Sequence, residues 1–244
     1  MRFKKIYPLL FFMQALFAKD GFFIGAEMQL GNTNIKEKVC GIRCTMDKSS
    51  VNNEYIYTNS NFTSFDAGLL LGYQHLFDEK KAHGLKASLH LYGGTGYKIS
   101  SKSNDIWFFE LNYIPIKTGL DLAYIFNFYN QEEHKVGFSV GVGYEVDIYL
   151  PSNGKYIEPI SRHAANLKTK NLIAHGIYPT LGFYYILKQH HKFEINYRYT
   201  GLIKQINPDD SIIVNSQVNR EHLDPITHKL QYNNYFVLNY SYIF

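Results

Sequence analysis

The last fifteen residues of the chain, 230–244, alternate in character with a period of two. Counting back from the carboxy terminus, every second residue is aromatic or apolar, and these residues are Phe236, Leu238, Tyr240, Tyr242 and Phe244. Because successive side chains of a β-strand point to opposite faces, this spacing predicts a strand with one apolar face. Such a face at the end of a chain needs a protein partner or an apolar solvent. A lipid bilayer is such a solvent.

The first eighteen residues have the layout of an export signal. Three cationic residues lie within the first five positions, an apolar run follows over 6–17, and Ala18 ends it. This order predicts a signal peptide over 1–18 that is cleaved after Ala18, which leaves a mature chain of residues 19–244. An amino-terminal membrane anchor is the alternative, but the apolar run is shorter than the roughly 20 residues that a spanning helix needs.

Composition narrows the class of the mature chain. No later apolar run is long enough for a spanning helix, so the chain is either a soluble protein or a membrane barrel. The mean hydropathy is −0.24 although the chain contains 21 Tyr and 18 Phe. A barrel combines these properties because its apolar and polar positions alternate. Most of the net charge of +4 lies in the signal peptide, and no basic patch or motif indicates nucleic-acid binding.

Eight segments show the alternation of a membrane-crossing strand. They are 21–31, 65–77, 84–97, 113–128, 136–150, 177–187, 192–204 and 230–244. The segment 136–150 is the most regular, and it is longer than the typical strand of about 5–6 residues. A tilted strand needs about 10 residues to cross a bilayer. Pro179 interrupts the sixth segment and predicts either a local bulge or a later start of that strand.

The connections between these segments alternate between short and long. Polar stretches over about 32–64, 98–112, 151–171 and 205–229 are long, and the other three connections are short turns. This is the pattern of an all-β fold, a transmembrane antiparallel up-and-down β-barrel with short periplasmic turns and four long extracellular loops. Eight strands let the first strand pair with the last, so that no edge is exposed to hydrocarbon. Ten strands remain the alternative, since 54–58 or 211–218 could add a hairpin arm above the membrane.

Charged residues of both signs fall on the inward positions of these strands. They are Glu27, Asp66, Lys86, Lys117, Asp121, Glu145, Asp147, Glu194, Arg198 and Lys204. The interior of an eight-stranded barrel is only wide enough to be filled by side chains. We expect these charges to pair with one another, because an unpaired buried charge is costly. A narrow ion-conducting pore lined by the same residues is the alternative.

The two cysteines of the chain, Cys40 and Cys44, lie in the first predicted extracellular loop. In an exported protein, an even pair at this spacing predicts a disulfide. Metal binding is the alternative, but two thiolates without a nearby histidine supply only half of a tetrahedral zinc site. We therefore expect no metal and no cofactor.

Some eight-stranded barrels modify lipids, and a serine beside a strand-borne histidine would indicate such an enzyme. Ser88 and His90 form the one pair of this kind. Both are predicted to face inward, whereas a lipid substrate is presented at the outer face. We expect no enzyme activity, and a lipid-modifying enzyme is the least favoured of the alternatives.

Two stretches carry a family resemblance that extends over the mature chain. The mature start, 19–25, reads Lys-Asp-Gly-Phe-Phe-Ile-Gly, and the end, 239–244, reads Asn-Tyr-Ser-Tyr-Ile-Phe. Together they resemble the outer-membrane protein families of Helicobacter. The resemblance implies a place in the bacterial outer membrane, among its lipids and lipopolysaccharide. The C-terminal strand by itself resembles the terminal strand of bacterial outer-membrane β-barrels in general, which implies that the barrel-assembly machinery recognises its apolar positions.

The resemblance also frames the expected function. Larger members are adhesins with a long extracellular domain between the two ends, and this chain has no such domain. What the resemblance implies is a barrel that presents surface loops in a structural or interaction role, with adhesion to host surface ligands as a family-level role. A narrow porin-like channel for ions or small solutes is the alternative. The sequence names no ligand for the loops.

Overall fold

The computed structural model of the chain describes residues 21–40, 55–103, 107–157, 164–168, 171–205, 213–214 and 227–244. Among these residues, no helix is long and apolar enough to cross a membrane. The strands are β1 (Phe22–Cys40), β2 (Tyr55–Leu76), β3 (His83–Gly94), β4 (Tyr97–Ser103), β5 (Trp107–Asn130), β6 (His134–Ile157), β7 (Ala164–Lys168), β8 (Leu172–Leu187), β9 (His191–Tyr199), β10 (Lys204–Gln205), β11 (Ile213–Val214) and β12 (Thr227–Ile243).

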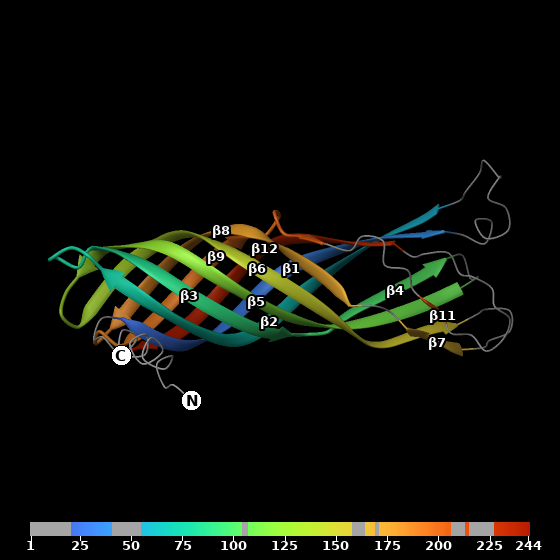
Figure 1. Ribbon diagram of the computed structural model, residues 1–244, viewed down its shortest axis with the longest axis horizontal. Helices are drawn as coiled ribbons and strands as arrows, with labels where there is room; N and C mark the ends of the chain where they lie inside the picture. The colour runs from blue at the N-terminus through green and yellow to red at the C-terminus, as the bar shows by residue number, and fades with distance from the viewer. Residues whose placement is uncertain are drawn as a thin grey trace, which may run out of the picture.

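Eight of these strands close into an antiparallel barrel. Hydrogen-bonded pairs follow the order β1, β2, β3, β5, β6, β8, β9 and β12, and β12 pairs back with β1. The closing register runs from Phe23 opposite Ile243 to Lys38 opposite Thr227. Figure 1 shows these strands tilted around a common axis. The prediction of an eight-stranded up-and-down β-barrel is confirmed.

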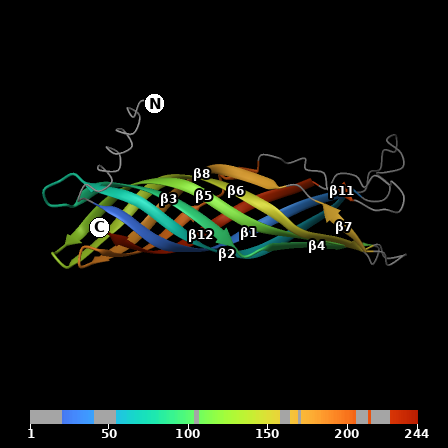
Figure 2. The same cartoon turned by 60° about the horizontal axis from the view of Figure 1, so that its bottom comes forward.

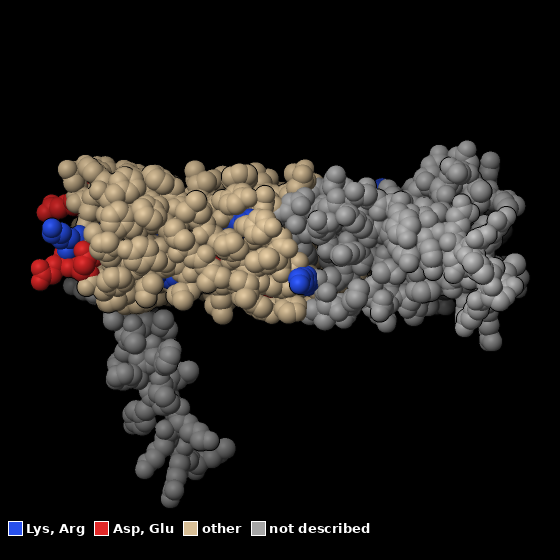
Figure 3. All heavy atoms as spheres, turned by 90° about the horizontal axis from the view of Figure 1, so that it is seen from above, with Lys and Arg blue, Asp and Glu red and all other residues tan. Residues whose placement is uncertain are grey.

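The period of two in the sequence separates the outer and inner faces of the barrel wall. Phe236 on β12 and Phe244 directly after it are each 61% exposed, whereas Tyr235 and Val237 on β12 are at most 1% exposed. All five residues predicted as the C-terminal signal lie on the outer face. The outer positions form a wide belt with few charged atoms, and charged side chains gather at one end of the described barrel (Figure 3).

That end, which we call the turn end, holds the short turns at 77–82, 131–133 and 188–190. The carboxy terminus lies there too (Figures 1 and 2), and the Phe244 amide donates to the Phe22 carbonyl at 2.9 Å. Lys81, Lys188 and Gln189 adopt positive φ angles of 50°, 51° and 63°, which let the chain reverse within a few residues. The three predicted short turns are therefore confirmed.

The first of these turns is held by one carboxylate. Asp78 accepts hydrogen bonds from the backbone amides of His83 at 2.6 Å and Ala82 at 2.9 Å. These donors, that of His83 above all, lower the pKa of the Asp78 carboxyl. An aspartate that accepts from amides further along the chain is a common device of tight turns.

At the opposite end, which we call the extended end, several strands continue past the closed barrel. The pairing of β2 with β3 stops at Asp66 and Gly94, but β1 and β2 stay paired as far as Cys40 and Tyr55. On the other side, β5 and β6 stay paired as far as Phe108 and Ile157, with β4 beside β5. Figure 1 shows two separate ribbons at this end.

These extensions correct the predicted loops. Much of the stretches 32–64, 98–112 and 151–171 is paired strand, and the strands lie within the ribbons rather than adding to the barrel. The segment 55–58 belongs to β2, and 213–214 pairs with β7 as the short strand β11. The polar composition of these stretches led to the prediction of loops. A strand that lies beyond the membrane does not need an apolar outer face, so it lacks the alternation that identifies a barrel strand.

The prediction for Pro179 is wrong. β8 begins at Leu172, earlier than predicted, and runs through Pro179 opposite Val142 without a shift of register. The β8–β9 pairing begins only at Thr180, so Pro179 has one paired neighbour strand and a missing amide is tolerated. Register shifts occur instead between Gly31 and Thr33 in β1, and at two places along the β5–β6 pair.

The charged lumen as candidate functional site

The inward positions of six strands bring most of the predicted charges into the barrel interior. Nine of the ten are at most 8% exposed: Glu27, Asp66, Lys86, Lys117, Asp121, Glu145, Asp147, Glu194 and Arg198. They come from β1, β2, β3, β5, β6 and β9, and each lies on the face of its strand that is turned away from the apolar belt.

Lys204 is the exception, and its predicted inward position is wrong. β9 ends at Tyr199, and a turn follows in which the Ile203 amide donates to the Thr200 carbonyl at 3.0 Å. This turn changes the phase of the alternation, so that Ile203 is buried and Lys204 is exposed. Lys204 instead begins β10, which pairs with β8 at His175.

Lys192 is a lumen residue that was not predicted. Its side chain is 1% exposed, and its ammonium lies 4.3 Å from the centre of the Tyr184 ring. A signal was present in the sequence, because Lys192 precedes Glu194 by two residues and therefore shares its face. It was missed because it lies at the first position of the predicted strand.

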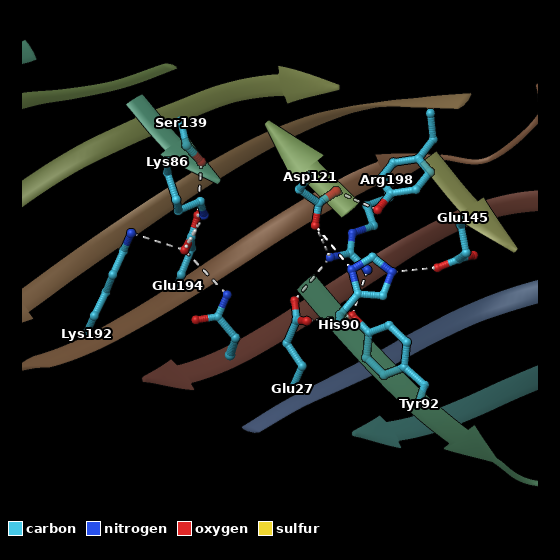
Figure 4. A network of polar contacts seen from close by, with 12 residues as sticks. Glu27, Lys86, His90, Tyr92, Asp121, Ser139, Glu145, Lys192, Glu194 and Arg198 are labelled. Carbon is cyan, nitrogen blue, oxygen red and sulfur yellow. Dashed lines mark hydrogen bonds and ion pairs between the residues drawn. The ribbon is translucent and has the colours of Figure 1, made fainter. Parts of the chain in front are cut away.

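The part of the lumen nearer the turn end is centred on Glu194, and we call this cluster the Glu194 group. The Lys86 ammonium lies 2.7 and 2.8 Å from the two carboxylate oxygens, and the Lys192 ammonium lies 3.3 Å from one of them. Ser139 donates to the same carboxylate at 3.0 Å and the Asn239 amide at 3.4 Å. One carboxylate therefore faces two cations (Figure 4).

The middle of the lumen is centred on Arg198, and we call this second cluster the Arg198 group. The guanidinium lies 3.1 Å from a Glu27 oxygen and 3.2 Å from an Asp121 oxygen, and it donates to the Tyr92 hydroxyl at 2.7 Å. Tyr92 in turn donates to Glu27 at 2.6 Å, and Tyr178 donates to Asp121 at 2.5 Å. Every contact in this group joins residues from different strands (Figure 4).

His90 extends the Arg198 group toward a third carboxylate. Its Nε2 lies 3.2 Å from Glu145, and its Nδ1 lies 3.3 Å from Asp121. Both ring nitrogens of His90 thus face acids, and the described hydrogen bond of the ring is to Glu145 rather than to Ser88. The Ser88 and His90 side chains are both buried inside the barrel, away from the lipid-facing surface.

A further ion pair lies toward the extended end. The Lys117 ammonium is 2.8 Å from Asp66, which also accepts from the Gln29 amide at 2.7 Å. Lys117 donates to the Tyr235 hydroxyl at 3.2 Å. Asp147 accepts from Tyr149 at 3.4 Å. Among the described residues, the interior therefore holds six carboxylates against four Lys and Arg side chains, with His90 between two of the acids.

Packing between the Glu194 and Arg198 groups is tight. The cavity between them, lined by Lys86, Asp121 and Arg198 among others, has a volume of about 10 Å³, which is room for about one water molecule. Gly143 has an essential place here, since a Cβ atom there would lie 2.2 Å from Asp121 and 2.4 Å from the Tyr178 hydroxyl. The glycine-rich inner face of β6 makes room for the long side chains opposite.

Two further predictions stay untested. Cys44 and the signal peptide over 1–18 lie outside the described residues, so the Cys40–Cys44 disulfide and the cleavage site remain predictions. Among the described residues, no group of three or more metal-ligating side chains is placed to hold a metal ion.

The amino-acid sequence matches one known protein family. The sequence model described as Helicobacter outer membrane protein matches residues 68–244, which is more than half of the chain. No curated protein matches significantly.

Several solved structures are similar to this chain at a low level. The attachment invasion locus protein Ail of Yersinia pestis is 11% identical, with a TM-score of 0.30, and the match covers 92% of this chain and 99% of that one. OprG, an outer membrane protein of Pseudomonas aeruginosa, is 13% identical with a TM-score of 0.45, and the match covers 93% and 97%. Neisserial surface protein A is 11% identical with a TM-score of 0.34, and the match covers 92% and 98%. Similarities this low say nothing about what this chain binds.

Proposed function

Because this chain belongs to the Helicobacter outer membrane protein family, we propose that it is a non-conducting barrel that presents its extended end to partners at the cell surface. The turn end then lies in the periplasm and the extended end outside, as is general for outer-membrane barrels. The observation that carries the proposal is the filled lumen: the barrel interior is occupied by paired charges, while strands continue beyond the barrel.

The lumen supports a structural role better than a transport role. A conducting pore needs a continuous water path, and the interior between the Glu194 and Arg198 groups has room for about one water molecule. Opening a path there would separate buried ion pairs that are held at hydrogen-bond distance on different strands. The same packing leaves no space for a substrate beside Ser88 and His90, so the proposal includes no enzyme activity.

The extended end supports an interaction role. β1 and β2 carry their pairing from Leu30 and Phe65, which lie on the exposed outer face, to Cys40 and Tyr55. A paired ribbon costs less entropy to fix against a partner than a flexible loop of the same length, because its backbone is already ordered. Adhesion to a host surface ligand is the role within this class that the proposal favours.

The proposal also includes two partners within the bacterial envelope, the barrel-assembly machinery and the lipids of the outer membrane. The apolar residues from Phe236 to Phe244 at the C-terminal end lie on the outer face of the wall, and we expect the barrel-assembly machinery to recognise them. The apolar belt would be solvated by outer-membrane lipids and, on the outside, by lipopolysaccharide.

Planar-bilayer recordings test the filled lumen. The mature protein, refolded until it shows the heat-dependent gel shift of a folded barrel, should give no discrete conductance steps. Lys117→Gln and Glu145→Gln should be equally silent. Steps that are seen in the unmodified protein and change in either variant would overturn the proposal in favour of a narrow pore.

A hairpin deletion tests the interaction role. Asn34 and Asn61 are opposite each other in the β1–β2 pairing, so replacing residues 35–60 by Asn-Gly should close a two-residue hairpin. This variant should keep the heat-dependent gel shift and lose adherence of the bacteria to host cells. Unchanged adherence, after this deletion and after the equivalent shortening of β5 and β6, would contradict a role of the extended end in adhesion.

A further inference from the structure

Three histidines at the turn end repeat one arrangement. His83 begins β3, His134 begins β6 and His191 begins β9, so each is the first strand residue after a short turn. The Nδ1 atom of each lies within hydrogen-bond distance of a tyrosine hydroxyl on the following barrel strand. The pairs are His83 with Tyr124, His134 with Tyr185 at 2.7 Å and His191 with Tyr240 at 2.9 Å.

The three pairs also share one register. His83 is opposite Phe126, His134 is opposite Leu187 and His191 is opposite Tyr242. In each case the tyrosine lies two residues before that opposite residue, on the same outer face and nearer the middle of the barrel. The histidines occupy every second strand, which spaces them by ~10 Å across the wall. We call these three pairs the His–Tyr ring.

One polar atom of each imidazole is left over. The tyrosine hydroxyl can donate to Nδ1, which places the imidazole proton on Nε2. Among the described residues, no hydrogen bond uses the Nε2 atom of His83, His134 or His191. All three side chains are partly exposed, so each can offer Nε2–H to a group outside the protein.

The position of the ring between the apolar belt and the turns indicates which chemical group of a lipid it could contact. Its tyrosines border the apolar belt, with Tyr240 41% exposed beside the similarly exposed outer residues Phe193 and Leu238. Beyond the histidines lie the charged side chains of the turns (Figure 3): Asp78, Glu79, Lys80, Lys81, Glu132, Glu133 and Lys188. The ring therefore lies where hydrocarbon gives way to headgroups, and the anionic group at that level of a phospholipid is its phosphate.

We propose that the His–Tyr ring binds the phosphate groups of phospholipids in the periplasmic leaflet, with each Nε2–H as the donor. The tyrosine orients the ring through Nδ1, in the way that a second hydrogen bond fixes the other nitrogen of a functional histidine. Three such donors on alternate strands hold the barrel at a defined depth. The pair formed by Tyr144 and His175 at 2.6 Å has the same register relation but lies away from the turn end, so it is not part of the ring.

Solid-state NMR tests the contact directly. The mature protein, labelled at the histidine nitrogens, would be refolded in phosphate-free buffer into vesicles of phosphatidylethanolamine and phosphatidylglycerol. Dephasing of nitrogen signals by phosphorus should affect Nε2 signals and spare Nδ1 signals. His90, which is 0% exposed inside the lumen, is an internal control that should show no dephasing.

Variants assign the signal. The triple variant His83→Phe, His134→Phe, His191→Phe keeps an aromatic ring at each position and should lower the total dephasing at least two-fold. Each single variant should remove about a third of that loss, which keeps the test decisive if the triple variant fails to show the heat-dependent gel shift. Absence of dephasing in the unmodified protein, or equal dephasing in the folded variants, would overturn the proposal. Neither result depends on whether the barrel conducts or adheres.

Discussion

The Glu194 group and the Arg198 group solve the same problem with opposite balances of charge. In the Glu194 group, one carboxylate faces two lysines, Lys86 and Lys192. In the Arg198 group, one guanidinium faces two carboxylates, Glu27 and Asp121, and His90 links the group to a third, Glu145. Excess positive charge near the turn end thus lies next to excess negative charge in the middle. The comparison teaches that neither group is neutral alone and that the excess charge of one partly offsets that of the other, while the lumen as a whole, among the described residues, holds six carboxylates against four Lys and Arg side chains.

The largest effect should come from the centre of the Arg198 group. Arg198→Met leaves Glu27 and Asp121 without their cation, and removing one member of a buried ionic cluster costs roughly 3–5 kcal/mol. The free energy of unfolding, from urea titration of the folded barrel in detergent micelles, should fall by that amount. Adding Asp121→Asn should restore part of it, because the two residues are in contact. An unchanged unfolding midpoint would show that the group is not a unit.

The matching change in the Glu194 group should cost less. Glu194→Gln leaves the two lysines without a counter-charge, but the amide oxygen can still accept from Lys86. Loss of hydrogen bonds to a charged group costs roughly 1.5–3 kcal/mol, so the same titration should show a smaller shift than for Arg198→Met. The double variant with Lys192→Met should recover stability. A loss larger than that of Arg198→Met would reverse the comparison.

Removing a neutral donor should have a still smaller effect. Ser139 donates to Glu194 at 3.0 Å but carries no charge. Ser139→Ala should therefore lower the free energy of unfolding by about 0.5–1.5 kcal/mol, the usual range for one hydrogen bond. If Ser139→Ala cost as much as Glu194→Gln, the balance of charge would not be what stabilises this group.

The smallest effect should lie outside both groups and depend on pH. The pKa of Asp78 is lowered in the folded protein, chiefly by the His83 amide, so its carboxylate stabilises the fold above about pH 4, the ordinary value for Asp. This contribution is lost as the pH falls through the lowered pKa. Asp78→Asn should therefore be slightly less stable than the unmodified protein at neutral pH, and the difference should vanish in acid. A difference that grows in acid would contradict this assignment.

The sequence predicts the barrel well because lipid imposes the period of two. Every strand that crosses the belt must show apolar residues on alternate positions, so the eight strands and nine lumen charges could be found by counting. Lys204 and Lys192 were misjudged because the phase of the alternation is uncertain at strand ends, where a turn such as 200–203 can change it. The strands of the extended end were missed because no apolar solvent shapes their outer face.

The partners of each charge could not be predicted. Glu27 meets Arg198, and Lys86 meets Glu194, only because the tilt and stagger of the strands bring those inward positions to the same level. Stagger depends on all eight registers together, including the shift between Gly31 and Thr33. The aromatic residues that complete the network, Tyr92 and Tyr178, are likewise placed by stagger and carry no signal of their own in the sequence.

The central ions of both groups, Glu194 and Arg198, are carried by β9, the last barrel strand before the one that closes the wall. Their partners lie far back in the chain, with Lys86 separated by 108 residues from Glu194 and Glu27 by 171 residues from Arg198. A growing chain that has laid down its first six barrel strands therefore still carries a set of unmatched acids and lysines. Until β9 joins the wall, these charges need water or another partner, because an unpaired buried charge is costly. The order of the strands thus places the closure of the wall and the pairing of Lys86 and Glu27 with their partners on β9 at the same late stage of assembly.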